Sequence, residues 1–422
     1  MDFAPSERAH ELAGLVKAFI EAEIEPIEAE YHAEVKRRRD AGQGENWVEL
    51  PVIKELQAKA RAQGLWNLFL PAGHEGPYAE RYGTLGGAGL SNIDYAPLAE
   101  LMGRSFIAPS IFNCAAPDTG NMEVLLKYGS QEQKDRWLEP LLQAEIRSAF
   151  LMTEPGVASS DATNMELTAV VDGDEIVLNG RKWFSSGVGH PDCEVFIVMG
   201  LTDTDPEASR HRRHSMVLVP RDTPGVTIER MLPVMGFLDE PHGHGEVSLT
   251  DVRVPVTNFI GGPGEAFAIA QGRLGPGRVH HCMRTIGLAE KALELAITRG
   301  TDRVAFGKPL VNLGGNRERV ARARIAIDST RLLVLNAAWK LDQGGPMNAI
   351  SEVSQIKVAA PSMALDIIDF AMQIHGGGGL TDDFPLAAAW TGARSLRFAD
   401  GPDEVHLGLI ARLELMKYGH ER

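Results

Sequence analysis

The chain opens with apolar residues that recur at three- and four-residue intervals, which is the spacing of one helix face. Between residues 12 and 20 this spacing is kept by Leu12, Leu15, Val16, Phe19 and Ile20. We therefore predict a mostly helical region from residue 6 to about residue 145. A glycine-rich stretch, residues 73–95, interrupts it and predicts a loop. Ser130 and Gln133 form a capping-box pattern, which predicts that a further helix begins there.

The pattern changes near Phe150, where short β-branched runs replace the helical period. The runs occupy residues 176–178, 195–199 and 216–219, and residues 245–254 alternate between polar and apolar side chains. Such runs are typical of strands, the last of them half exposed. Turn signals separate or flank the runs at Asp172-Gly173-Asp174, Asn179-Gly180 and Pro224-Gly225. A small β-domain is predicted here.

The helical period returns after the Gly/Pro-rich segment 261–264. One helix face collects Ile286, Ala289, Leu293, Ala296 and Ile297. Residues 317–342 contain no Gly or Pro, and Gly344-Gly345-Pro346 then predicts a stop. Further helices are predicted over 349–374, with a kink at Pro361, and over 382–398 and 403–418.

The order helices, strands, helices predicts a mostly α fold with a central β-domain. We place the domains at 1–148 (helical), 149–258 (β) and 259–422 (helical bundle). The length of 422 residues suits about three domains, or two large ones.

Composition and charge narrow the function. The formal net charge of −15 argues against nucleic-acid binding, since phosphate contacts need clustered Lys and Arg. No run approaches the roughly 18 apolar residues of a membrane span. The first residues resemble neither a signal nor a transit peptide, which predicts a cytoplasmic protein. The isolated cysteines Cys114, Cys193 and Cys282 predict no disulfide framework.

Candidate chemistry lies in three segments. Residues 399–404, Ala-Asp-Gly-Pro-Asp-Glu, fall between two helical stretches, where a carboxylate can reach a pocket and abstract a proton. Residues 152–156 and 182–187 are two further candidate loops. Histidine pairs at 242/244 and 280/281 have no sequence neighbours that supply three or four convergent ligands, so no metal site is predicted.

Four motifs resemble those of one enzyme family. They are Phe150-Leu151-Met152-Thr153-Glu154-Pro155-Gly156, Asn179-Gly180-Arg181-Lys182-Trp183, Arg303-Val304-Ala305-Phe306-Gly307-Lys308 and Gln373-Ile374-His375-Gly376-Gly377. In this order around a β-domain they are similar to the acyl-CoA dehydrogenases, over nearly the whole chain. That family's fold has an N-terminal helical domain, a middle β-barrel and a C-terminal four-helix bundle.

The ending Asp400-Gly401-Pro402-Asp403-Glu404 and the segment 158–164 resemble one branch of the family. Animal members of this branch are fused to an aminoglycoside-phosphotransferase-like kinase domain and handle 4-hydroxyacyl-CoAs. Acyl chain length, branching and a 4-hydroxy preference stay open at this point.

The resemblance implies FAD as the cofactor. The residues it assigns to FAD in the first two motifs and the loop beyond are Phe150, Met152, Thr153, Ser160, Trp183, Phe184 and Ser185. Hydroxyls and backbone N–H groups such as those of Thr153 and Ser160 can bind flavin heteroatoms or a pyrophosphate. Trp183 would cover one flavin face, although an ordinary core tryptophan is the alternative.

The other two motifs imply cofactor contacts across a subunit interface. Arg303 would grip the FAD pyrophosphate of a neighbouring subunit, because a guanidinium suits a diphosphate. Phe306, Gln373 and Gly377 would lie near the same cofactor. Pro402 replaces a family hydroxyl residue, and the resemblance extends loosely to Asp403 and Glu404 as neighbours of the ribose or pyrophosphate.

The implied reaction is α,β-dehydrogenation of an acyl-CoA to a trans-2-enoyl-CoA. A carboxylate takes the α-proton while a hydride passes from the β-carbon to the flavin. Desolvation raises the pKa of such a base, and donors to the thioester oxygen stabilise the developing enolate. Asp400 is our candidate base, with its own backbone N–H as one donor. The alternative is that Asp400 only caps the final helix.

Most of the family carries Glu where this chain has Asp400, and Asp is shorter by about 1.5 Å. A subset places its base before the arginine that matches Arg278, but here that position is Gly277. Arg278 would lie beside the substrate, unless it serves a structural ion pair. The remaining candidates for substrate contact are Ser160, Gly275, Pro276, Gly277 and Gly401.

The partners implied are an acyl-CoA, an electron-transferring flavoprotein and further copies of the chain, as a homodimer or homotetramer. Two alternatives stay open. One is an oxidase or flavin monooxygenase on the same fold, and the other is a non-catalytic relative that binds partners.

Overall fold

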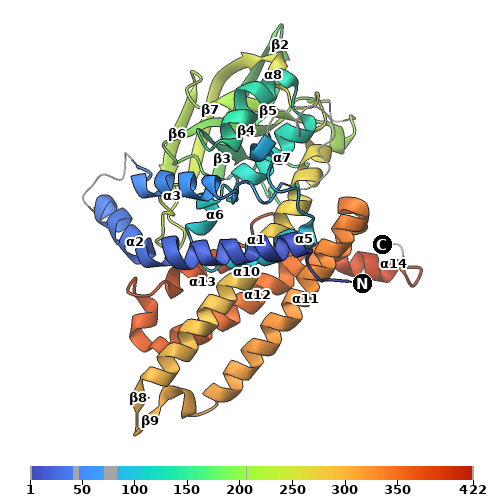
Figure 1. Ribbon diagram of the computed structural model, residues 1–422. Helices are drawn as coiled ribbons and strands as arrows, with labels where there is room; N and C mark the ends of the chain where they lie inside the picture. Colours follow the sequence, from blue (N-terminus) through green and yellow to red (C-terminus); the bar gives the residue numbers. More distant parts are fainter. Residues whose placement is uncertain (1, 41–46, 71–82, 206, 421–422) are drawn as a thin grey trace. The chain divides into compact units, whose positions relative to one another are not determined.

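A computed structural model describes residues 2–40, 47–70, 83–205 and 207–420 (Figure 1). The chain folds into two compact units. The first contains residues 1–26, 90–109 and 275–422, and the second contains residues 27–89 and 110–274. Helix α10 (Ala266–Asp302) passes from the second unit into the first. The predicted domain boundaries stay a prediction.

The first unit is helical. Its N-terminal part contains α1 (Glu7–Phe19), the π-helical turn η1 (Ile20–Ile24) and α5 (Asn92–Met102). Its C-terminal part contains most of α10, a hairpin of β8 (Val304–Ala305) and β9 (Lys308–Pro309), α11 (Asn316–Asn348), α12 (Ile350–His375), α13 (Leu386–Ser395) and α14 (Asp403–Met416). Short 3-10 turns are η7 (Leu310–Asn312) and η8 (Gly376–Leu380).

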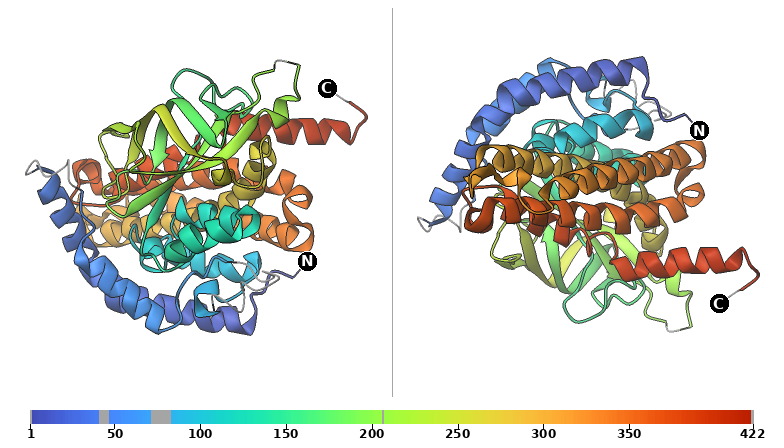
Figure 2. Two further views of the ribbon diagram at one scale, coloured as in Figure 1. Left: turned by 90° about the horizontal axis from the view of Figure 1, so that it is seen from above. Right: turned by 90° about the horizontal axis from the view of Figure 1, so that it is seen from below.

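Helix α12 is the centre of this unit. It packs against α11, α13 and α14, and α11 and α12 run side by side (Figure 2). Fifteen residues of α12 are buried, Lys357 and His375 among them. A helix that is apolar on most of its surface belongs in a core, which explains this central place.

The second unit holds the sheet. Its helices are α2 (Glu25–Asp40), α3 (Pro51–Ala62), α6 (Ala108–Ile111), α7 (Asp118–Tyr128), α8 (Gln131–Gln133) and α9 (Glu139–Leu142), with the turns η3 (Gly83–Gly86), η4 (Lys134–Leu138), η5 (Arg210–Arg212) and η6 (Val256–Asn258). The strands are β1 (Arg147–Leu151), β2 (Thr168–Asp172), β3 (Glu175–Ser186), β4 (Cys193–Leu201), β5 (His214–Pro220), β6 (Val226–Met231) and β7 (His244–Pro255).

The strand order is β1-β4-β2-β3-β7-β6, and β5 pairs with β4. Strands β1 and β4 are parallel, and the long pairings β3–β7 and β4–β5 are antiparallel. The buried β-branched runs of these strands form one core cluster, which includes Phe196, Val198, Val217 and Val219.

A buried ion pair ties α7 to the sheet. Arg147 Nη1 lies 3.4 Å from Asp118 Oδ2, and both side chains are buried. The same aspartate accepts hydrogen bonds from Ser148 N (2.8 Å) and Ser148 Oγ (2.6 Å). Because a buried carboxylate must be paired, this network fixes the start of β1 and so the position of Phe150.

Most of the predicted elements are confirmed, together with the helix–strand–helix order. Ser130 and Gln133 form the predicted capping box. Backbone angles leave the helical region at Gly344 and Gly345, as the stop signal predicts. Helix α12 continues through Pro361.

Two predictions are wrong in part. The predicted loop 73–95 has residues 71–82 outside the described range, but α5 already begins at Asn92, capped by the Ser91 side chain. Asn179-Gly180 is no turn: it lies within β3, where the register against β7 shifts. Gly180, with a φ of 146°, permits that bulge, so a turn signal marks a bulge instead.

Candidate active site

A buried lysine organises the segment after β1. Lys182, on β3, is fully buried and donates hydrogen bonds to Met152 O (2.8 Å) and Glu154 Oε1 (2.7 Å). The Glu154 carboxylate also accepts from the backbone N–H groups of Glu166 (2.7 Å) and Leu167 (3.0 Å). Burial lowers the pKa of Lys182 to about 8, against the effect of Glu154. The ion pair therefore fixes the path of residues 152–154.

Two aromatic side chains, Trp183 and Phe184, lie directly after Lys182 on β3. Trp183 N donates to Thr153 O (2.9 Å), and the rings of Trp183 and Phe184 meet edge to face, 5.0 Å apart. Phe184 is 47% exposed and has a φ of 48°, in a strand whose register shifts between Lys182 and Ser185. The segment predicted as a second loop is thus a bulged part of β3. Trp183 is only partly buried and is no ordinary core residue.

Ser185 offers a buried hydroxyl in the same place. The residue is fully buried, and its Oγ has no hydrogen-bond partner among the described residues. A buried polar atom needs a partner, and a bound cofactor atom can supply one. Ser160, by contrast, is exposed.

An arginine outside the predicted set covers Phe150. The Arg273 guanidinium lies 4.0 Å from the centre of the Phe150 ring, and its Nε donates to Asn121 Oδ1 (3.3 Å). A Cβ at Gly120 would come within 3.0 Å of Arg273 Nε, so a glycine lets the arginine approach α7. Burial raises the pKa of the nearby Glu123 to about 8.

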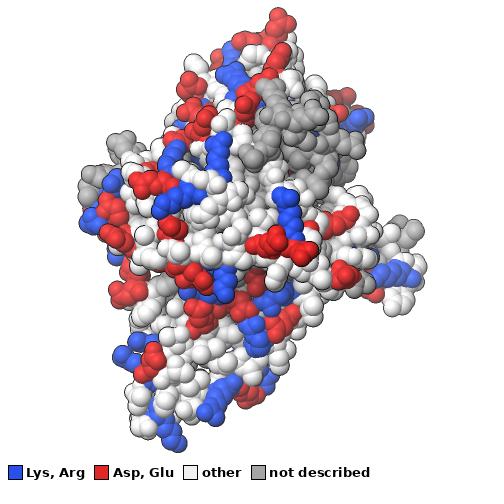
Figure 3. All heavy atoms as spheres, viewed as in Figure 1, with Lys and Arg blue, Asp and Glu red and all other residues white. Residues whose placement is uncertain are grey.

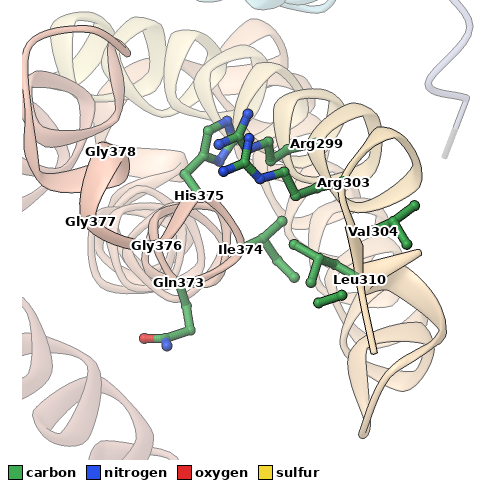
Figure 4. Close-up of a pocket in the computed structure, with 11 residues that line it drawn as sticks. Arg299, Arg303, Val304, Leu310, Gln373, Ile374, His375, Gly376, Gly377 and Gly378 are labelled. Carbon is green, nitrogen blue, oxygen red and sulfur yellow. The ribbon is translucent and has the colours of Figure 1, made fainter. Parts of the chain in front are cut away.

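In the first unit, the third and fourth motifs form one pocket of about 510 Å³. Arg303, Gln373 and Gly377 all line it, as do two residues that sequence reasoning did not select, Arg299 and His375. In Figure 4 the two guanidinium groups and the His375 ring point toward one another, and Gln373 points away from them. Two guanidinium groups beside a run of glycine backbone are well suited to a diphosphate.

Further contacts define the edge of this pocket. Arg299 Nε is buried without a hydrogen-bond partner among the described residues, and the ring of His375 packs on Phe384 with 4.5 Å between centres. Phe306 stands at the tip of the β8–β9 hairpin, 97% exposed, with a φ of 50°. An aromatic side chain so exposed is available for contact with another molecule.

The candidate base lies on the loop between α13 and α14. Arg278 Nε, on α10, donates to Asp400 O (2.9 Å), and His281 Nε2 lies 3.8 Å from Asp400 Oδ2. The Asp400 side chain is 21% exposed. Asp400 and Gly401 have φ angles of 57° and 104°. Helix α14 begins at Asp403 and its N-cap is Pro402, so the alternative that Asp400 caps it is wrong.

The neighbouring candidates take different places. Asp403 is buried, and its Oδ2 accepts a hydrogen bond from Arg397 Nε (2.6 Å), whereas Glu404 is exposed. Gly275, Pro276 and Gly277 lie inside α10. Their contacts with substrate or cofactor, like those of Pro402, Asp403, Glu404 and Gly401, stay predictions.

The donor set fits FAD. A buried, unpartnered serine hydroxyl in one unit suits a flavin heteroatom, and an unpartnered arginine Nε in the other suits a pyrophosphate oxygen, both judged among the described residues. Sequence reasoning quoted Lys182 and Glu154 in motifs without giving them a role, and it did not select Arg273 or Arg299. Arg299 had a signal: it precedes Arg303 by four residues, and Arg303, directly after the end of α10, donates its backbone N–H to Arg299 O (3.1 Å).

On the face shown in Figure 3, acidic and basic side chains are interspersed rather than gathered by sign. No helix in the described parts of the chain is both long and apolar enough to cross a bilayer.

Comparison with known proteins gives three consecutive family models. The acyl-CoA dehydrogenase N-terminal, middle and C-terminal domains match residues 6–145, 149–252 and 264–415. FadE2 of Mycobacterium tuberculosis, whose name places it among acyl-CoA dehydrogenases, is 50% identical over 99% of this chain and 98% of its own length. Mouse acyl-CoA dehydrogenase family member 11 is 50% identical over 98% of this chain.

The solved structures agree. A Mycobacterium abscessus structure assigned to the acyl-CoA dehydrogenases shares 66% identity, with a TM-score of 0.92 over 98% of this chain and all of that one. Butyryl-CoA dehydrogenase from Megasphaera elsdenii shares 25% identity, with a TM-score of 0.80 over 98% of this chain and all of that one. The chain spans about half the length of the mouse family member 11, of which it covers 51%.

The chain belongs to the acyl-CoA dehydrogenase family. FAD is the cofactor that this membership assigns to it, as the sequence resemblance predicts.

Proposed function

We propose that this chain catalyses the α,β-dehydrogenation of an acyl-CoA thioester, with Asp400 as the base. The observation that supports the proposal most is the Asp400 loop. The Asp400 carboxylate is largely buried, and Arg278 Nε donates a hydrogen bond to the backbone carbonyl of Asp400. FAD, when bound, supplies the acceptor for the hydride of the β-carbon.

The residues of the chain perform the proton chemistry. The Asp400 carboxylate takes the α-proton, so that proton and hydride leave neighbouring carbons and a trans-2-enoyl-CoA results. The backbone N–H of Asp400 is the proposed donor to the thioester oxygen, where negative charge develops. Partial burial removes water that would compete for the base.

Electrons then pass to an electron-transferring flavoprotein in this proposal. The test is a panel of acyl-CoAs offered anaerobically to the FAD-loaded protein, with the flavin absorbance as readout. Reduction by at least one thioester is expected, and no reduction by any would favour the non-catalytic alternative. Peroxide release under air, at the rate of substrate use, would favour the oxidase or monooxygenase alternative.

Arg303 provides a test of cofactor binding. Arg303→Leu removes a charged hydrogen-bond donor from the pocket of Figure 4 and should weaken FAD binding by about 10- to 100-fold. FAD content after gel filtration and a fluorescence titration measure this. Arg322→Leu, which removes an exposed arginine of α11, is the control and should keep FAD. Equal retention in both variants would remove Arg303 from the cofactor site.

The pocket that contains Arg303 also leads to a proposal about the oligomeric state. We propose a homodimer or homotetramer in which Arg303 and the exposed Phe306 reach the cofactor of a neighbouring subunit. Mass measurement in solution tests this, and a monomer that retains FAD would contradict it.

A further inference from the structure

A buried lysine binds backbone carbonyls of the loop that carries Asp400. Lys357, on α12, is 2% exposed, and its Nζ donates to Leu396 O (2.5 Å) and Ala399 O (2.7 Å). Both carbonyls belong to the segment between α13 and α14. A cation at the C-terminal end of a helix interacts favourably with its dipole, and Leu396 is the C-cap of α13.

Two other helices bind the next carbonyl of the same loop. Arg278 Nε, from α10, donates to Asp400 O, and His406 Nε2, from α14, lies 3.3 Å from the same oxygen. Ser354 Oγ contacts His406 Nδ1 (3.2 Å) and thereby holds the ring. Three helices thus supply polar side chains to three carbonyls of one short loop.

The backbone of this loop needs such support. Residues other than glycine adopt the left-handed region rarely, although Asp and Asn tolerate it best, and Asp400 has a φ of 57°. Such a conformation persists only where the surroundings impose it. The Lys357 hydrogen bond to Ala399 O acts on the peptide unit directly before Asp400.

Burial of the positive charge of Lys357 is unfavourable, so a functional reason for it is expected. Burying an ammonium group is unfavourable unless it is well paired, and a methionine would fill a similar volume. The hydrogen bonds of Lys357 found among the described residues go to neutral carbonyls. Burial lowers the pKa of Lys357, and the electrostatic attraction of the Asp400 and Asp403 carboxylates opposes that effect and favours the charged ammonium group.

We propose that Lys357 is a positioning residue for the proposed reaction: its ammonium group fixes the Asp400 backbone, and its charge attracts the Asp400 carboxylate, the proposed acceptor of the α-proton. This inference rests on the proposed function. It assigns Lys357 no contact with substrate or FAD.

The other groups that face Asp400 do not share this role in the same way. From α10 these are Arg278, His281 and Cys282, and from α14 they are His406 and Asp403. Burial lowers the pKa of His406 to about 4 and raises the pKa of Cys282 to about 12, so both are neutral at pH 6–9.

Arg284 orients the neighbouring histidine, His281. Arg284 Nη2 lies 3.2 Å from His281 Nδ1, and an arginine only donates. This assigns the proton of His281 to Nε2, which faces Asp400 Oδ2. Arg278 stays charged, although burial lowers its pKa.

The test compares Lys357→Met with Lys357→Arg in the FAD-loaded protein. The pH profile of kcat/KM for an acyl-CoA is the readout. Without the charge Asp400 binds a proton more readily, so the acid limb should move to higher pH by about one unit in Lys357→Met. The rate at the pH optimum should fall about 10-fold or more, with FAD content unchanged.

Lys357→Arg keeps the positive charge and is therefore the control for Lys357→Met. Lys357→Arg should return the acid limb to the wild-type pH, even where its larger head lowers the maximal rate. Lys417→Met, an exposed lysine of the same unit, should match the wild type throughout. If Lys357→Met does not fold, Lys357→Gln, which keeps a donor but no charge, should show the same shift.

Two results would overturn the inference. One is a rate lowered equally at every pH, which is the mark of a purely structural residue. The other is the same acid limb in the charged and uncharged variants. Both are distinct from failure of the proposed function, in which the wild type itself would not reduce FAD with any acyl-CoA or Asp400→Asn would remain active.

Discussion

Replacing Asp400 by Asn should lower turnover of an acyl-CoA by about 10³-fold or more, because the amide cannot accept the α-proton. FAD content and the denaturation midpoint should change little, since Asn tolerates the left-handed backbone that Asp400 adopts. Arg278 and His406 bind the backbone carbonyl of Asp400 rather than its carboxylate, so those contacts survive the substitution. Steady-state rates with an artificial electron acceptor measure the effect.

Asp366→Asn is the matched control, because it neutralises an exposed aspartate of the adjoining α12. It should keep the wild-type rate. Asp400→Glu separates length from charge: a base one methylene longer should restore part of the turnover lost in Asp400→Asn. Near-normal turnover in Asp400→Asn would remove Asp400 from the mechanism and return the loop to a structural role.

Lys182→Met should have the largest effect on stability. The substitution leaves the Glu154 carboxylate buried without its cation, and breaking a buried pair in this way costs about 3–5 kcal/mol. Chemical denaturation of the protein at saturating FAD measures the loss. Because Lys182 also binds Met152 O, weaker FAD retention should accompany it.

The adjacent residue of β3 offers the control. Arg181 is largely exposed, and the buried Glu246 carboxylate that it contacts is also bound by Arg230 Nε (2.7 Å), so Arg181→Met leaves Glu246 paired and should cost less than about 1 kcal/mol. The double variant Lys182→Met/Glu154→Gln should be less destabilised than the sum of its single changes, because no unpaired charge remains buried. Equal effects of Lys182→Met and Arg181→Met would contradict the account of this ion pair.

The strands of the β-domain could be predicted from the sequence because they are buried and β-branched. The runs 195–199 and 216–219 pair as neighbours in one sheet, β4 with β5. Asn179-Gly180 shows the limit. A glycine inside a strand and a glycine in a turn give the same local signal, and only the pairing partner β7 distinguishes them.

The candidate site was predictable where a motif marks it. Arg303 belongs to one motif and Gln373 and Gly377 to another, far along the chain, and the three residues do line one pocket. Lys357 was not found, although it lies on the apolar face of α12 between Ile356 and Ala360. A lone lysine in such a stripe carries no motif, and its partners are backbone carbonyls, which any sequence would provide.

Anaerobic addition of an acyl-CoA to the FAD-loaded protein tests the central claim most directly, with the flavin absorbance followed in the wild type and in Asp400→Asn. The account predicts that the yellow band bleaches in the wild type and persists in the variant. A band that persists in the wild type with every thioester, or one that bleaches equally fast in the variant, would contradict it.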